Sequence, residues 1–133
     1  MKQRPILSAA FGVLCLFMMG RASAQTNISV HDPVMIRQDS VYYAFFTGQG
    51  VSVWSSVNRL DRRRESPVFD KPPQWAVDAI PGFRGSIWAP DISYHNGLYY
   101  LYYAVSAFGK NTSCIGLRRR GRQRHPAYHQ IVQ

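Results

Sequence analysis

Two stretches of the chain share one pattern of aromatic and β-branched residues, at residues 37–46 and 94–103, an offset of 57 positions. In each, a short polar turn precedes a run in which apolar side chains occupy successive positions instead of alternating with polar ones. Such a run is typical of a strand that is covered on both faces. Strand-built units that repeat at roughly 40–50 residues are typical of β-propeller blades. A core strand of a β-sandwich would show the same run, so the pattern alone leaves both architectures open.

Each unit is predicted to be a three-stranded meander. The first places strands at residues 34–36, 41–47 and 51–55, and the second at residues 92–94, 98–105 and 113–117. The dipeptide Asn96-Gly97 is a strong signal for a tight hairpin turn within the second unit. Residues 58–84 between the units are rich in proline and arginine, which predicts a connection without a long helix.

The first 24 residues predict a signal peptide. A short basic start is followed by an apolar run at residues 6–19 and by the small-residue sequence Ala22-Ser23-Ala24. The apolar run is short for a membrane-spanning helix, although a retained anchor is the alternative. We therefore expect a secreted or periplasmic product that has no membrane contact after cleavage.

The net charge of +9 is concentrated at the two ends of the chain. The body, residues 25–117, has eight basic and seven acidic residues, so its charge does not predict a nucleic-acid partner. Residues 118–133 carry five arginines and no acid or apolar period, which predicts an atypical, unpacked tail. A shifted reading frame or a truncated gene would explain such a tail. A basic interaction protein that acts through this tail is the weakest functional alternative.

An aspartate stands shortly before each aromatic strand. Asp32 lies between His31 and Pro33, and Asp91 ends the motif Trp88-Ala89-Pro90-Asp91. In a propeller the first strand of a blade begins at the central channel, where Asp32 could meet carboxylates from other blades. The alternative for Asp32 is a turn aspartate before proline. No set of His, Cys, Asp and Glu has metal-ligand spacing, so no metal or cofactor is predicted for this chain.

Several motifs in the same order resemble glycoside hydrolase family 43, and in particular its endo-1,5-α-L-arabinanases. They are His31-Asp32-Pro33-Val34, residues 50–56, Trp88-Ala89-Pro90-Asp91-Ile92 with residues 96–103, and residues 106–113. The resemblance covers about residues 29–117. It implies an all-β fold in which residues 25–117 form about two blades of a five-bladed propeller, as a monomer at full length.

The resemblance also implies a reaction. Such enzymes hydrolyse α-1,5-arabinan with inversion, using an aspartate as general base, a glutamate as general acid and a second aspartate that tunes the acid. Asp32 matches the base, whereas Asp91 matches a second-blade position expected to bind substrate. Glu65 is the only glutamate and matches no acid position. The chain is therefore expected to be an inactive N-terminal piece, and the ligands of the family's channel metal are expected to lie mostly outside it.

Trp88 and Phe108 match aromatic positions around the arabinanase cleft. An aromatic ring face stacks on the apolar face of a sugar, so both are predicted to contact a polysaccharide or oligosaccharide substrate. Packing in the core is the alternative role for each. The runner-up function for the whole chain is a small secreted carbohydrate-binding module that uses Trp54, Trp88 and Phe108 without catalysis.

Overall fold

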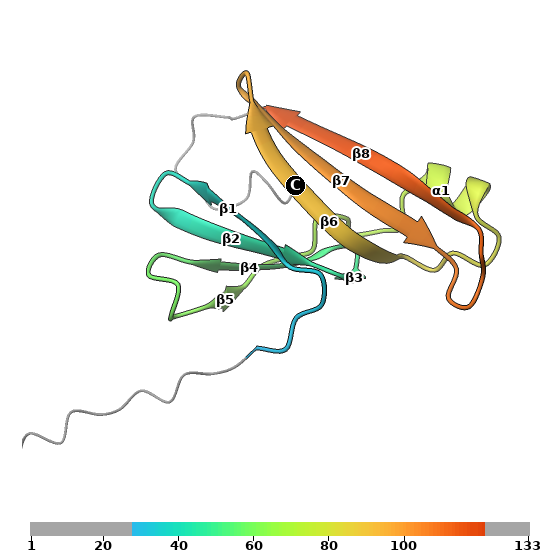
Figure 1. Ribbon diagram of the computed structural model, residues 1–133, viewed down its shortest axis with the longest axis horizontal. Coiled ribbons are helices and arrows are strands. Elements are labelled where there is room, and N and C mark those ends of the chain that lie inside the picture. Colours follow the sequence, from blue (N-terminus) through green and yellow to red (C-terminus); the bar gives the residue numbers. More distant parts are fainter. Residues whose placement is uncertain (1–27, 122–133) are drawn as a thin grey trace, which may run out of the picture.

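The computed structural model describes residues 28–121, which form two four-stranded antiparallel sheets and one short helix (Figure 1). The first sheet has the order β1-β2-β4-β5, with bounds Val34–Gln38, Val41–Phe46, Ser52–Ser56 and Arg63–Arg64. The second sheet has the order β3-β6-β7-β8, with bounds Gly48–Gln49, Ser86–His95, Leu98–Ser106 and Ser113–Gly121. Helix α1 spans Gln74–Ala79. The predicted signal peptide and residues 122–133 of the predicted tail lie outside the described residues.

Both predicted meanders are confirmed. In the first, Gln38 pairs with Val41, so Asp39 and Ser40 form a two-residue turn, in which Asp39 has a left-handed φ of 54°. In the second, Asn96 and Gly97 have φ values of 48° and 80° and join β6 to β7. The turn at Asn96 and Gly97 thus has the positive φ at both central residues that a type I′ hairpin turn requires, and asparagine and glycine adopt it most readily.

The core lies between the two sheets, where β1 and β2 pack against β6. Its fully buried side chains include Phe45 and Val53 from the first sheet and Ile87 and Val105 from the second. Figure 1 shows the sheets side by side, with α1 beside the second sheet. Ala76 of α1 and the adjacent Ile80 are also fully buried, so the connection between the units closes one end of the core.

The third strand of the second unit is longer than predicted. β8 continues to Gly121, and Arg118, Arg119 and Arg120 pair with β7. The prediction that the unpacked tail begins at residue 118 is therefore wrong for residues 118–121. Arg118 donates a hydrogen bond of 2.7 Å to the carbonyl oxygen of Val68 and lies over the Phe69 ring at 4.9 Å. Strand pairing uses backbone groups, and an arginine buries its apolar stem while its head finds a partner.

The connection and the first unit contain elements that the sequence pattern did not indicate. β5 pairs with β4, and the short strand β3 leaves its own unit to pair with β6 of the second sheet. The chain therefore passes from the first sheet to the second immediately after residue 47. Among residues 28–121, the structure contains no helix that is long and apolar enough to cross a membrane.

Candidate functional site

Asp32 lies at the entry to β1 and is held by two side chains. Its Oδ2 accepts a hydrogen bond of 2.9 Å from the Thr47 hydroxyl and lies 2.8 Å from Nδ1 of His31. The backbone N–H of Thr47 also donates to the carbonyl oxygen of His31, at 3.0 Å. The side chain of Asp32 remains 40% exposed, so the carboxylate is fixed in direction and still open to solvent.

The same threonine connects Asp32 to the second sheet. The N–H of Ala89 donates to Oγ1 of Thr47 at 3.0 Å. Ala89 belongs to the Trp88-Ala89-Pro90-Asp91 motif on β6, so the structure brings this motif and Asp32 to one place. Asp32 and Ala89 both have left-handed backbone conformations, with φ values of 50° and 44°.

The electrostatic surroundings favour the ionised form of Asp32. The hydrogen bond from Thr47, followed by the contact with His31, lowers the pKa of the Asp32 carboxyl below its usual value. A group that is hydrogen-bonded in its charged form loses its proton more readily. Asp32 is thus a carboxylate at neutral pH, which is the form that can accept a proton.

Trp88 and Phe108 lie together, as an aromatic pair. Their ring centroids are 6.4 Å apart and the rings are inclined by 27°, in a stacked arrangement. Phe108, in the loop between β7 and β8, is 90% exposed, whereas Trp88 is partly buried and its Nε1 is enclosed. Phe108 therefore does not pack in the core. Trp88 lies beneath it, and the two rings together form an aromatic surface that faces solvent.

The other two carboxylates singled out from the sequence do not join Asp32. Asp91 is exposed on β6 opposite Tyr102, beyond an irregularity in the strand register, and no hydrogen bond or ion pair in residues 28–121 links it to Asp32. Glu65 accepts a hydrogen bond of 2.5 Å from Ser55 and lies 3.7 Å from Nε of Arg63. The Glu65 side chain is only 6% exposed, so its role is to join β4 to the following segment.

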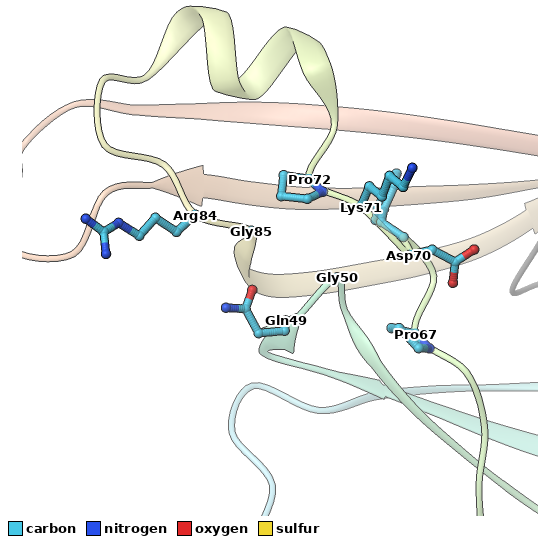
Figure 2. A pocket seen from close by; sticks show the side chains of 9 residues that line it. Gln49, Gly50, Pro67, Asp70, Lys71, Pro72, Arg84 and Gly85 are labelled. Carbon is cyan, nitrogen blue, oxygen red and sulfur yellow. The ribbon is translucent and has the colours of Figure 1, made fainter.

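Two pockets open along the junction of the sheets. The first, of about 220 Å³, is shown in Figure 2, where Gln49 and Arg84 lie on one side and Lys71 and Asp70 on the other. The second, of about 400 Å³, also contains Gln49 and Arg84 and reaches the ring of Phe108. Hydrogen-bonding side chains thus lie beside the exposed aromatic surface. The described residues contain no group of three or more His, Cys, Asp and Glu that could hold a metal ion.

Thr47 is the site residue that the sequence patterns did not indicate. It follows the first aromatic strand, but the corresponding position of the second unit is Ala104, so the repeat does not mark it. Its importance follows from its contacts with Asp32 and Ala89, both of which are distant from it in the sequence. No local signal could have identified it.

Comparisons with known proteins agree with this arrangement. The family model described as Glycosyl hydrolases family 43 matches residues 26–126. The chain is 46% identical over 109 residues to the extracellular exo-alpha-(1->5)-L-arabinofuranosidase ArbA of Cellvibrio japonicus (strain Ueda107), covering 82% of this chain and 30% of that protein. It is 42% identical over 96 residues to the extracellular endo-alpha-(1->5)-L-arabinanase 1 of Bacillus subtilis (strain 168), covering 69% and 30%.

A solved structure gives the same result. The Cellvibrio cellulosa α-L-arabinanase complexed with arabinohexaose matches with a TM-score of 0.66 and 49% identity, covering 70% of this chain and 30% of that chain. This chain therefore spans less than a third of the length of these relatives. The matched family model covers most of the sequence, residues 26–126. The chain belongs to glycosyl hydrolase family 43.

Proposed function

We propose that this chain is the base-bearing part of a secreted enzyme that hydrolyses α-1,5-linked arabinan with inversion. The observation that carries the proposal is the ionised, solvent-accessible carboxylate of Asp32, fixed by Thr47 and His31 beside an exposed aromatic pair. Export follows from the signal peptide proposed at residues 1–24 and from the extracellular location in the names of both relatives.

Asp32 has the properties that the base of an inverting glycosidase needs. In that reaction the base takes a proton from water as the water oxygen attacks the anomeric carbon, while a carboxylic acid protonates the departing oxygen. The two groups lie about 6.5–9.5 Å apart so that water fits between base and sugar. A carboxylate that is ionised at neutral pH and open to solvent can accept the proton of that water.

The aromatic pair supports a sugar ligand. Phe108 presents an open ring face, and the pocket beside it contains Gln49, Ser86 and Arg84, which can bind hydroxyl groups. An apolar platform next to a few hydrogen-bonding groups is typical of carbohydrate sites. We assign Trp88, Phe108 and Asp91 to substrate binding, with an arabinan chain as the ligand because a similar enzyme was solved with arabinohexaose.

The general acid is proposed to come from outside this chain. Glu65, the only glutamate, is engaged with Ser55 and Arg63 and is almost fully buried. The outer face of β8 exposes Ile115 and Leu117, which are 72% and 45% exposed. Exposed apolar sheet faces of this kind are usually covered by a partner. We therefore propose that the two sheets are two of five propeller blades, and that further blades cover these faces and supply the acid.

Completing the chain tests this function. A fusion of residues 1–121 to the remaining blades of the Cellvibrio japonicus relative is expected to release reducing sugar from linear arabinan, whereas the 133-residue chain alone is expected to release none. Hydrolysis by the chain alone would contradict the need for an external acid. A folded fusion that cleaves xylan and leaves arabinan intact would contradict the substrate assignment. Cooperative melting and arabinan binding by the isolated chain would instead support a carbohydrate-binding module.

A further inference from the structure

We propose that Thr47 is a positioning residue that holds the Asp32 carboxylate and the Trp88–Ala89 backbone in one fixed arrangement. The inference rests on the proposed function insofar as Asp32 is taken as the general base. The three residues that this contact joins come from separate segments. Asp32 lies at the entry to β1, Thr47 at the end of β2 and Ala89 near the start of β6. Thr47 is the residue through which the two sheets meet at the site.

The hydrogen-bond chemistry of a hydroxyl fixes the direction of this connection. A threonine hydroxyl has one proton to donate and two lone pairs that accept. The backbone N–H of Ala89 can only donate, so Oγ1 accepts from it at 3.0 Å. An ionised carboxylate can only accept, so the single hydroxyl proton points to Oδ2 of Asp32, at 2.9 Å. Each partner therefore reinforces the orientation that the other requires.

The carboxylate is also prevented from rotating. The Thr47 hydroxyl and Nδ1 of His31 both bind Oδ2, so turning the carboxylate away from this orientation would weaken both interactions at once. His31 is the ionisable side chain among residues 28–121 that forms an ion-pair contact with Asp32. The backbone N–H of Thr47 donates a hydrogen bond to the carbonyl oxygen of His31. Thr47 thus restrains the base directly and also through the backbone of its neighbour.

The backbone on both sides of Thr47 is consistent with this role. Asp32 and Ala89 are two of the six residues other than glycine with positive φ in residues 28–121. Such conformations are uncommon for side-chain-bearing residues and persist where surrounding contacts hold them. At Ala89 the N–H that Thr47 binds belongs to the strained residue itself, immediately after Trp88. Thr47 therefore also fixes the backbone from which the aromatic surface extends.

The test measures Asp32 and Ala89 separately in the 133-residue chain by NMR. Thr47→Val keeps the shape of the side chain and removes the hydroxyl. We expect the pKa of the Asp32 carboxyl, followed through its Cγ resonance, to rise toward its usual value. We also expect hydrogen exchange at the Ala89 amide to accelerate about tenfold, the effect of losing one ordinary hydrogen bond. Thr47→Ser retains the hydroxyl and is expected to preserve both values.

Thr112→Val is the matched control, because Thr112 is exposed in the loop between β7 and β8. It is expected to change neither readout. If Thr47→Val leaves both values unchanged, the proposal is wrong. If Thr47→Val does not fold, Thr47→Ser decides: wild-type values support the proposal and displaced values overturn it. None of these readouts depends on hydrolysis, so the positioning role and the proposed function can fail independently.

Discussion

Replacing Asp32 with asparagine in the completed fusion is expected to slow arabinan hydrolysis by about 10²–10⁴-fold, the usual contribution of a general base. Asparagine has nearly the same shape and can still accept the hydrogen bond from Thr47, so the local structure should persist. Its amide cannot take a proton from water. The loss is therefore expected in kcat, with little change in KM, measured on linear arabinan near neutral pH.

Asp39→Asn is the matched control for this substitution. Asp39 lies at the other end of β1 from Asp32, in the turn to β2, so the same chemical change is made outside the site. It is expected to leave kcat unchanged. Equal activities of the Asp32→Asn and Asp39→Asn fusions would show that Asp32 is a structural turn residue and that another group activates water.

Replacing Phe45 with alanine is expected to reduce the free energy of unfolding by about 3–5 kcal/mol, because a large side chain leaves a cavity in a packed core. Phe45 is 0% exposed and lies on β2, the strand between β1 and β4. Since small domains are stable by only about 5–15 kcal/mol, this loss is a large fraction of the total. Urea denaturation of the fusion, followed by circular dichroism, measures it.

Phe108→Ala provides the comparison for Phe45→Ala. The same atoms are removed, but Phe108 is 90% exposed, so the free energy of unfolding is expected to change by no more than about 0.5 kcal/mol. Similar losses for the two variants would contradict the assignment of Phe45 to the core and of Phe108 to an open surface. Phe45→Leu leaves a smaller cavity and gives a measurable value if the alanine variant does not fold.

The strands could be predicted from the sequence because their signals are local. Runs of tyrosine and phenylalanine mark β2 and β7, and Asn96-Gly97 supplies the turn that joins β6 to β7. Asp32 could be singled out because it precedes the first aromatic strand in a recognisable motif. Each of these inferences uses residues within about ten positions of one another.

The missed features depend on contacts between distant residues. β3 leaves its own unit to pair with β6, and Thr47 contacts Ala89 across the sheet junction. The lack of an apolar period and of acids in residues 118–133 predicts an unpacked tail, yet the backbone of Arg118 pairs with β7 and its guanidinium binds the Val68 carbonyl oxygen. Composition indicates which side chains are polar, but it does not indicate which of them find a partner in the folded chain.

Rescue of an Asp32→Ala fusion by azide tests the role of Asp32 most directly. Azide is already a nucleophile and needs no base, so it can attack the anomeric carbon from the side on which Asp32 would activate water. We expect azide to restore turnover and the product to be the β-arabinofuranosyl azide, with configuration opposite to that of the α-linked substrate. An Asp32→Ala fusion that hydrolyses arabinan at the wild-type rate, or an azide product that retains the α configuration, would contradict Asp32 as the general base of an inverting hydrolase.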